Sequence, residues 1–409
     1  MACHAVSAPS SRRCLRAPWD IPEHRKGLSM ELGLTETQEL LRNSARNFFE
    51  NECPLGRVRE IQASQEGFSR REWEQAAALG WPGLLVAETY QGSGGNLMDA
   101  VILLEEVGRA LAPLPLASTA VVGALALQEF GTEAQRATLL PRIAVGESII
   151  ALAVTEPSAS YHADGIRTRA RLVGDRYILD GTKLFVRDGT IADLLLVATR
   201  TEDSENPEHG ITLFLVDAHA RGVGVTPLIT SARDRQAEIQ FSEVAVPHDA
   251  VVGTVGGGWP VIRKLIDLAA LSECAEMVGA GQRVFETTLD YAKTRVQFGR
   301  PIGSFQSLQH KVADMAIDID SSRFITYYAA WKADTSADAR ADIARTKVWV
   351  SDAFRRITRE AHQVHGGVGF IVDHDLHLFF GREKTAELYM GTPSYHRMAV
   401  AEAILGPAG

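Results

Sequence analysis

The sequence has few cysteines and no long apolar run. Its four cysteines are scattered over 409 residues and form no Cys-x-x-Cys pair, so they give no disulfide framework and fit a reducing compartment. The longest apolar stretch, 116–127, is interrupted by polar residues and falls short of the ~20 residues that cross a bilayer. We therefore expect a cytoplasmic protein without a membrane span. The cysteines are Cys3, Cys14, Cys53 and Cys274.

An excess of positive charge is also absent. Lys and Arg number 42 against 51 Asp and Glu, a formal net charge of −9, which argues against a nucleic-acid partner. Hydrophobic residues make up 45% of the chain, enough for large cores, and the length allows two or three domains.

Residues 1–29 differ from the rest of the chain. They are rich in Ala, Ser and Arg and carry no acid before Asp20, which is similar to the composition of a transit peptide. They contain no apolar segment like that of a secretory signal. We interpret them as a disordered leader, or as the product of a start assigned too early, with Met30 as the true start.

Helical patterns fill residues 30–148. Thr35-Glu-Thr-Gln38 is a capping-box pattern, and apolar residues recur after it at helical spacing. This region predicts an all-helical N-terminal domain. The predicted helices cover 39–49, 70–79, 97–112, 116–130 and 133–143.

The pattern changes at Ser148 to short apolar or alternating runs, which are typical of strands. Gly174-Asp175 and Asp180-Gly181 have the composition of hairpin turns. We predict an antiparallel β domain over 149–250, built as a small barrel or a two-layer sheet. The predicted strands cover 149–154, 167–173, 177–180, 183–186, 193–199, 211–216, 224–229 and 237–241.

Beyond the β region the chain is helical again. The glycine-rich stretch 253–259 lacks the G-x-G-x-x-G spacing of a dinucleotide loop, and we interpret it as a linker. Four long helices then predict a C-terminal four-helix bundle within 251–409, which makes the whole an α+β multidomain protein. The predicted helices cover 260–297, 304–333, 337–367 and 382–405.

The stretch 291–315 predicts two helices joined by a tight loop. Gly299 can end the first helix in a left-handed cap, Pro301 cannot continue it, and Ser304 can cap the second. Arg295 would lie in the last turn, where a cation suits the helix dipole and a guanidinium can hold a phosphate. From these residues alone, a helix–loop–helix with a surface arginine is the plainer interpretation.

Three ordered motifs resemble those of the acyl-CoA dehydrogenase family. Arg295 to Gln306 matches Arg-x-x-Phe-Gly-x-Pro-Ile-x-x-Phe-Gln, and the others are Val154-Thr-Glu-Pro157 and His362-Gln-Val-His-Gly-Gly-Val-Gly-Phe370. They occur in the family's order and near its spacing, and the match covers nearly everything after Met30. The resemblance implies an FAD-dependent oxidoreductase of fatty acid and lipid metabolism.

The resemblance also implies where FAD lies. Family members bind FAD between the β domain and the bundle, with the adenine end reaching a neighbouring subunit. Two glycines in succession can form an anion nest there, although they also suit an ordinary loop that needs a positive φ. The pyrophosphate and adenine contacts carried over are Arg295, Gln297, Phe298, Phe305 and Gln306, joined by Gln363, Gly366 and Gly367 from the partner chain.

On the flavin-ring side the chain departs from the family. Arg187 replaces a small threonine beside the ring, and Tyr161 is bulky where the family has a serine near the pyrophosphate and CoA. The resemblance therefore leaves the flavin geometry or the CoA path altered. The ring contacts carried over are Thr155, Phe185, Val186, Arg187 and Thr392, and the substrate contacts are Ser160, Tyr161, Asp267 and Met390.

The usual catalytic glutamate is missing. The family's α,β-desaturation uses a carboxylate to remove the α-proton of a thioester while hydride leaves the β-carbon for the flavin. The family's Tyr-Glu-Gly-Thr segment is here Tyr389-Met390-Gly391-Thr392, and the other known position, on the first bundle helix, is Ala269. Methionine cannot accept a proton, although the backbone N–H of Met390 can still hold a thioester carbonyl.

Glu273 and Asp267 are the candidate replacement bases. Glu273 lies one turn from Ala269 on the same helix face, and Asp267 lies two residues before it. Tyr395 and His396, which follow the Met390 loop, are further possibilities. Each of the four can equally serve as a cap, an ion-pair partner or a solvated group.

Two histidine pairs at i,i+3 spacing, His362 with His365 and His374 with His377, suggest a metal-binding face. Glycines interrupt the helix between the pairs, and the first pair lies inside a flavin motif. We therefore expect no metal site.

Three functions fit these residues. The first is an FAD-dependent acyl-CoA dehydrogenase with an unusual base, a homotetramer or dimer that passes electrons to an electron-transfer flavoprotein-type acceptor. The second is a base-lacking partner subunit of a mixed acyl-CoA dehydrogenase oligomer, which lends its pyrophosphate-side residues. The third is another flavin chemistry on the same fold, such as monooxygenation, where no carboxylate base is required.

Overall fold

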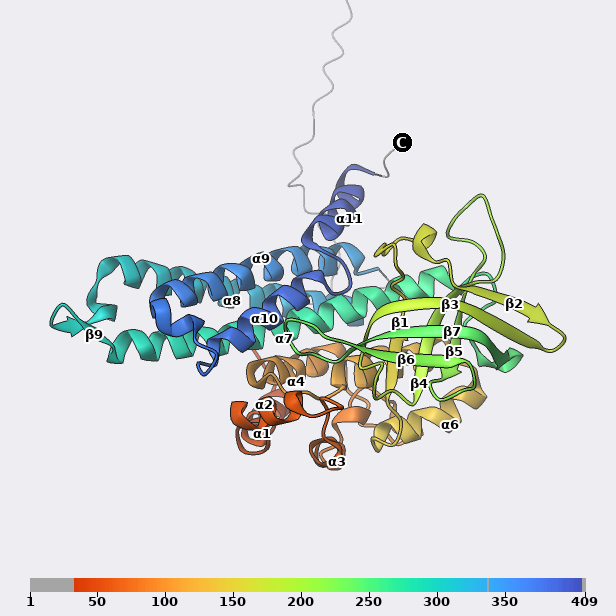
Figure 1. Cartoon of the computed structure of the whole chain (residues 1–409), viewed down its shortest axis with the longest axis horizontal. Helices are drawn as coiled ribbons and strands as arrows, with labels where there is room; N and C mark the ends of the chain where they lie inside the picture. Colours follow the sequence, from red (N-terminus) through yellow and green to blue (C-terminus); the bar gives the residue numbers. More distant parts are fainter. Residues whose placement is uncertain (1–32, 337, 407–409) are drawn as a thin grey trace, which may run out of the picture. The chain divides into compact units, whose positions relative to one another are not determined.

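The described part of the chain, residues 33–336 and 338–406 of this computed structural model, contains an N-terminal group of helices, a β-sheet and a set of long C-terminal helices (Figure 1). This order confirms the predicted fold class. The predictions for residues 1–29 and for a start at Met30 lie outside the described residues. No helix of the described residues is long and apolar enough to cross a membrane.

The N-terminal helices begin with the predicted capping box. Thr35 accepts the N–H of Gln38, and the Gln38 side chain accepts the N–H of Thr35, which satisfies two of the free N–H groups at the helix start. The predicted helix over 116–130 has a π-helical first half. The helices are α1 (Glu36–Glu52), α2 (Leu55–Ala63), α3 (Arg70–Ala78), α4 (Leu97–Ala110), the π-helix η3 (Leu116–Gly123), α5 (Ala124–Phe130) and α6 (Glu133–Ala144).

Helix α4 packs against the first bundle helix, α7 (Trp259–Thr294), with backbone touching backbone. A Cβ on Gly108 would lie 1.9 Å from the Glu276 carbonyl oxygen, and a Cβ on Gly279 would lie 1.7 Å from that of Glu105. No side chain fits at either position, since real Cβ contacts are far longer. The two glycines therefore set the distance between α4 and the part of α7 that carries Glu276.

The middle region forms one eight-stranded sheet in the order β6-β7-β3-β2-β4-β5-β8, with β1 paired to β4. Most pairs are antiparallel, as predicted, but β1 runs parallel to β4, and β2 makes a parallel contact with β4. Its apolar core gathers inward-facing residues such as Leu179, Leu195 and Phe214. The strands are β1 (Ile150–Ala153), β2 (Arg169–Val173), β3 (Arg176–Arg187), β4 (Leu194–Arg200), β5 (Ile211–Asp217), β6 (Val223–Leu228), β7 (Gln236–Pro247) and β8 (Val251–Val252).

One of the two predicted hairpin turns is wrong. Gly174 and Asp175 join β2 to β3, as predicted, but β3 continues through Asp180 and Gly181. There the pairing with β7 shifts by a bulge, and Asp180 Oδ1 accepts the backbone N–H of Glu243 at 2.9 Å. A bulge uses turn-like residues without reversing the chain, which explains the mistaken prediction.

The long helices are α7, α8 (Gln306–Thr335), α9 (Arg340–His365), α10 (Leu376–Leu388) and α11 (Pro393–Leu405). The helix predicted over 382–405 is in fact the end of α10 and the whole of α11. Between them Met390 and Gly391 have φ values of 52° and 106°, which a helix cannot contain. Thr392 then caps α11 by accepting the N–H of Tyr395. This break forms the Met390 loop, residues 389–392.

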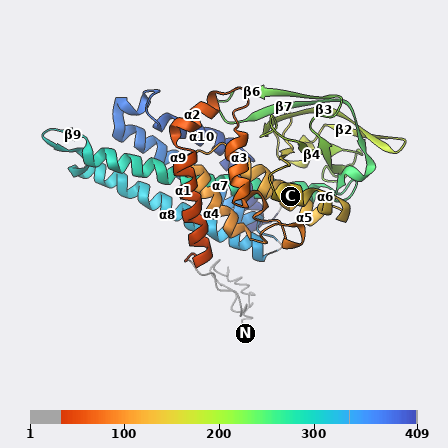
Figure 2. The ribbon, with the colours of Figure 1, turned by 90° about the horizontal axis from the view of Figure 1, so that it is seen from below.

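The loop between α7 and α8 is a small hairpin. Helix α7 ends at Thr294, and β9 (Val296–Gln297) pairs with β10 (Arg300–Pro301) around Phe298 and Gly299, at the end of α7 far from the sheet (Figures 1 and 2). Both turn residues have positive φ, 54° and 79°, as a two-residue hairpin turn requires.

Three predictions about this hairpin are wrong. Arg295 is not in the last turn of α7 but follows it as the C-cap, with extended backbone. Gly299 supplies a hairpin turn rather than a helix cap. Ser304 does not cap α8, because its hydroxyl donates to Pro301 O at 2.7 Å and Phe305 holds the N-cap position. Short helical turns complete the chain at Trp81–Gly83, Glu88–Tyr90, Ala163–Gly165, His248–Ala250, Ile302–Ser304 and Gly366–Phe370.

Candidate functional site

The residues predicted beside the flavin ring come together where the sheet meets α7 and the Met390 loop. Thr155 follows β1 and accepts the N–H of Leu184 at 2.8 Å, which ties it to the end of β3. Thr155, Val186 and Met390 are 4%, 1% and 2% exposed, whereas Phe185 is 45% exposed. We call four of the predicted ring contacts, together with Met390, which was predicted as a substrate contact, the ring-side residues: Thr155, Phe185, Val186, Arg187 and Met390.

Arg187 points from the end of β3 into two glutamates of α7. Its guanidinium pairs with Glu273 and, at 2.6 Å, with Glu276 Oε2, and it lies 5.5 Å over the Tyr389 ring. Burial lowers the pKa of Arg187, but the two carboxylates outweigh burial and raise it well above the ordinary value. Arg187 is therefore a fixed cation, and its charge is shared between two nearly inaccessible carboxylates.

The next residue, Asp188, faces a second buried cation. Arg235 Nη2 lies 2.6 Å from Asp188 Oδ1, and the Ser118 hydroxyl donates to Oδ2 at 2.6 Å. Arg235 also donates to Gly67 O and Pro113 O. Phe185 and Asp188 both adopt positive φ, 55° and 59°, which costs about 1–3 kcal/mol each in non-glycine residues. The buried ion pairs hold this strained end of β3 in place.

Tyr161 lies over Thr155 and the Met390 loop. Burial raises the pKa of its phenol, while the Thr155 side chain and the backbone of Met390 and Gly391, which approach the phenol oxygen, act in the opposite direction. The Tyr395 hydroxyl donates to Tyr161 O at 3.3 Å, and the two rings are 5.8 Å apart. Tyr161 is therefore packed against groups that the resemblance assigns to flavin and thioester.

Ser160 and Thr392, also predicted at the site, serve local structure. Ser160 Oγ accepts the N–H of His162 at 3.2 Å, and the Thr392 hydroxyl caps α11. His396 Nε2 lies 3.0 Å from Met390 O, and burial lowers the pKa of His396 to about 4. His396 is thus a neutral support for the Met390 loop.

The candidate bases lie in different surroundings. Glu273 is 2% exposed and paired with Arg187. Asp267 is half-buried in a cleft of about 400 Å³ between α7, the end of α8 and the start of α9. Burial raises the pKa of Asp267 to about 7, against the influence of Arg340 and Arg263. Ala269 is buried and lies between the two acids in sequence.

The residues predicted beside the pyrophosphate lie about 27 Å farther along α7, since 18 residues separate Glu276 from Thr294 at ~1.5 Å each. Phe298 is 91% exposed and meets Phe305 edge to face, with ring centroids 6.1 Å apart. Ala292, Ile302 and Val364 pack beneath the hairpin. Nearly all members of this group are exposed. We call them the phosphate-side residues: Arg295, Gln297, Phe298, Phe305, Gln306, Gln363, Gly366 and Gly367.

The paired histidines bond to the backbone. His362 Nδ1 lies 2.8 Å from Thr358 O, His365 Nδ1 lies 2.8 Å from Ala361 O, and His377 Nδ1 lies 2.7 Å from His374 O. The His365 ring also stacks on Tyr291 at 4.4 Å. Within residues 33–336 and 338–406, no three His, Cys, Asp or Glu side chains are grouped so that they could hold a metal ion.

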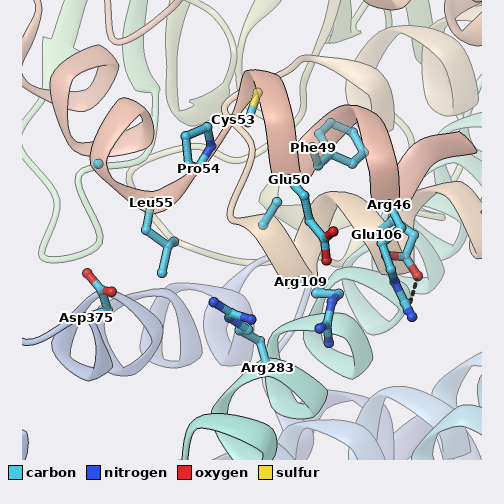
Figure 3. A pocket seen from close by; sticks show the side chains of 12 residues that line it. Arg46, Phe49, Glu50, Cys53, Pro54, Leu55, Glu106, Arg109, Arg283 and Asp375 are labelled. Atoms are coloured by element: carbon cyan, nitrogen blue, oxygen red, sulfur yellow. Dashed lines mark hydrogen bonds and ion pairs between the residues drawn. The ribbon is translucent and has the colours of Figure 1, made fainter. Parts of the chain in front are cut away.

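Sequence reasoning does not find a charged cleft of about 410 Å³ between α1, α4 and α7 (Figure 3). Arg46 pairs with Glu106 at 2.7 Å, and Arg109 Nη2 pairs with Glu286 at 2.5 Å. The residues come from separate elements, so no local motif marks them. Three arginines and three carboxylates line the cleft, so it has no excess of one sign. Sequence reasoning also misses Glu276, Asp188 and Arg235, although Glu276 follows Glu273 at i,i+3 spacing.

Known proteins match this chain along nearly its whole described length. Family models described as "Acyl-CoA dehydrogenase, N-terminal domain", "middle domain" and "C-terminal domain" match residues 35–147, 151–244 and 256–405. A probable acyl-CoA dehydrogenase, YngJ of Bacillus subtilis, is 31% identical over 92% of this chain and 100% of its own length.

Solved structures agree. Butyryl-CoA dehydrogenase from Megasphaera elsdenii superposes with a TM-score of 0.85 at 28% identity, covering 92% of this chain and 100% of that one. The ChsE4–ChsE5 complex from Mycobacterium tuberculosis gives 0.84 at 29% identity, covering 93% and 100%. An FAD complex of PigA gives 0.84 at 26% identity, covering 92% and 100%.

These matches confirm the predicted fold and the predicted class of function and cofactor, an FAD-dependent acyl-CoA dehydrogenase-like oxidoreductase. The chain belongs to the acyl-CoA dehydrogenase family.

Proposed function

We propose that this chain works in the α,β-desaturation of an acyl-CoA thioester, as one subunit of an FAD-dependent mixed oligomer whose other chain supplies the base. In that reaction the base takes the α-proton, hydride leaves the β-carbon, and a carbon–carbon double bond forms between them. FAD, when bound, accepts the hydride. The observation that carries the proposal is the engagement of Glu273 by Arg187 beside the Met390 loop.

This chain offers no ready base near its ring-side residues. Met390 and Ala269 hold the two family positions of the glutamate, and neither side chain accepts a proton. Glu273 is bonded to a cation and almost inaccessible, whereas a base must reach the proton that it removes. We take the missing glutamate as a feature of a subunit that no longer performs this step.

The phosphate-side residues support a cooperative role. Arg295 offers an exposed guanidinium, the kind of group that holds phosphate. Gly366, with φ of 61° and its N–H donated to His362 O, and Gly367 add exposed backbone without side chains at the end of α9. They lie about 27 Å farther along α7 than Glu276, and this separation favours a groove completed between chains. The two-chain ChsE4–ChsE5 complex supports a mixed assembly.

A homotetrameric or dimeric dehydrogenase with a displaced base is the second candidate, and Asp267 favours it. Its pKa near 7 suits a general base. Monooxygenation has no specific support. In either dehydrogenase form we propose domains 30–148, 149–250 and 251–409, a cytoplasmic location in fatty acid or lipid metabolism, and an electron-transfer flavoprotein-type acceptor.

The proposal is tested by comparing the lone chain with a co-purified complex containing a base-bearing acyl-CoA dehydrogenase-like chain of the same organism. With octanoyl-CoA and a dye acceptor, we expect the lone chain to reduce dye at under about 1% of the rate of the complex. Glu→Gln at the partner's base should abolish turnover, whereas Asp267→Asn and Glu273→Gln here should leave most of it. Fast turnover by the lone chain that Asp267→Asn removes would establish the second candidate instead.

A further inference from the structure

The charged cleft of about 410 Å³ between α1, α4 and α7 has no part in the proposed function (Figure 3). Its volume lies in the range of small-molecule sites, roughly 300–1,000 Å³. Arg283 of α7 lines it, and along the helix Arg283 lies ~10 Å from Glu276 and ~18 Å from Arg295. Among the described residues, none that lines the cleft is a ring-side or phosphate-side residue. The cleft is therefore separate from both groups of predicted FAD contacts.

Two arginines of the cleft have hydrogen-bond donors to spare. Arg109 Nη2 pairs with Glu286 at 2.5 Å, but Arg109 Nη1 is buried and has no hydrogen-bond partner within residues 33–336 and 338–406. Arg283 takes part in no ion pair or side-chain hydrogen bond of the described part of the chain. Figure 3 shows both side chains in the cleft, below Glu50. Because a buried donor without an acceptor is unfavourable, Arg109 Nη1 favours a bound acceptor beside Arg283.

The carboxylates of the lining are mostly occupied. Both Glu106 oxygens accept from Arg46, at 2.7 and 3.0 Å. Asp375 Oδ1 pairs with Arg59 at 2.8 Å. Glu50, exposed on α1, is the third lining carboxylate. The cleft can therefore accept one further negative charge, whereas a dianion such as phosphate would be repelled by the nearby carboxylates.

The opposite wall of the cleft is apolar. Phe49 and Cys53 of the α1 end are 2% and 1% exposed and stand behind Pro54 and Leu55 at the start of α2. Ala110, at the end of α4, has too small a side chain to fill the space. A ligand with one anionic group and a short hydrocarbon body matches the two walls, because guanidinium forks bind carboxylates and apolar surface favours a hydrocarbon.

We infer that this cleft binds a small organic monocarboxylate, whose carboxylate accepts from Arg109 Nη1 and Arg283 and whose apolar body lies against Pro54 and Leu55. An acyl-CoA does not meet this description, because its phosphates carry several negative charges. The inference does not depend on the mixed oligomer, and it adds a second ligand site to the chain.

The test uses sodium hexanoate as the probe and the lone full-length chain, with binding followed by saturation-transfer NMR titration at pH 7. Hexanoate should bind saturably. Hexanamide, which has the same shape without the charge, should bind at least ~10-fold more weakly, because it loses the charge-assisted hydrogen bonds. Inorganic phosphate should also bind more weakly than hexanoate, and excess FAD should leave hexanoate binding unchanged.

Two variants assign the binding to the cleft. Arg283→Met should weaken hexanoate binding ~10-fold or more, and Ala110→Phe should abolish it by filling the space. Arg221→Met, at an exposed position between β5 and β6, is the matched control and should bind as the wild type does. Circular dichroism checks that each variant is folded.

Four results would overturn the inference. They are the absence of saturable hexanoate binding by the wild-type chain, equal binding of hexanamide or phosphate, displacement of hexanoate by FAD, and undiminished binding by folded Arg283→Met and Ala110→Phe. Each of them would leave the proposed function intact, since that proposal is tested by turnover of the mixed complex.

Discussion

Two arginines beside α7 serve opposite purposes: the buried arginine, Arg187 of β3, meets the middle of the helix, and the exposed arginine, Arg295, follows its end. The Arg187 guanidinium lies inside the protein, where it pairs with two glutamates of α7 and lies over the Tyr389 ring. Beyond Thr294, Arg295 lies on an exposed hairpin beside Phe298. A buried arginine that is fully paired stabilises structure, whereas an exposed arginine remains available to a ligand. The family motif at Arg295 therefore says little about whether a ligand can reach the residues around Arg187.

The largest effect on stability should come from removing the buried arginine, Arg187. Arg187→Met leaves Glu273 and Glu276 without their cation, and we expect the free energy of unfolding to fall by about 3–5 kcal/mol. Urea denaturation measures it. The triple variant with Glu273→Leu and Glu276→Leu should recover most of the loss, and a small effect of Arg187→Met alone would show that the cluster is not an interior ion network.

Removing the exposed arginine, Arg295, should have the opposite pattern: little effect on stability and a large effect on FAD binding. Arg295→Ala should change the free energy of unfolding by less than about 0.5 kcal/mol, as for surface positions in general. It should weaken FAD binding to the mixed complex by ~10-fold or more, because a charge-assisted hydrogen bond contributes about 1.5–3 kcal/mol. Fluorescence titration with FAD gives the affinity, and Arg345→Ala, at an exposed position of α9, is the control. An unchanged affinity would contradict the phosphate-side assignment.

The pH dependence of stability should depend on Asp267, the half-buried acid of α7. Its folded-state pKa of about 7 exceeds the unfolded value of about 3.9, so the unfolded state releases the proton first. The free energy of unfolding should therefore fall as pH rises from about 4 to about 7, by at most ~2 kcal/mol given partial solvation. Asp267→Asn should flatten that part of the profile. An unaltered slope in the variant would mean that Asp267 is ordinarily solvated.

The smallest effect concerns a predicted cofactor residue that caps a helix. Thr392→Ala should lower the free energy of unfolding by about 1 kcal/mol, the usual cost of losing an N-cap. Thr294→Ala is the control, because the exposed Thr294 hydroxyl donates only to carbonyls of its own helix, Asp290 O and Tyr291 O. Equal melting temperatures for the two variants would place Thr392 outside the helix-capping role.

The fold and the place of the exposed loop after α7 can be predicted from local sequence. Capping boxes, apolar periodicity and the glycine–proline loop each act over a few residues. The set of contacts around Arg187 and Tyr161 cannot be predicted in this way. It depends on Arg187 meeting α7 some ninety positions later in the chain, and on Tyr161 meeting the Met390 loop more than two hundred positions away. Large side chains at positions 187 and 161, where the family has small ones, signal a change there, but only the tertiary contacts show which groups Arg187 meets.

The crossing of α4 and α7 has one further consequence. Gly108 and Gly279 bring the main chains of α4 and α7 into contact. The position of the α7 glutamates that pair with Arg187 therefore depends on the lack of a side chain at these two glycines. A single alanine at either glycine would push the helices apart and carry the carboxylates away from their guanidinium. The electrostatics of the interior thus depend on two residues that have neither a charge nor a side chain.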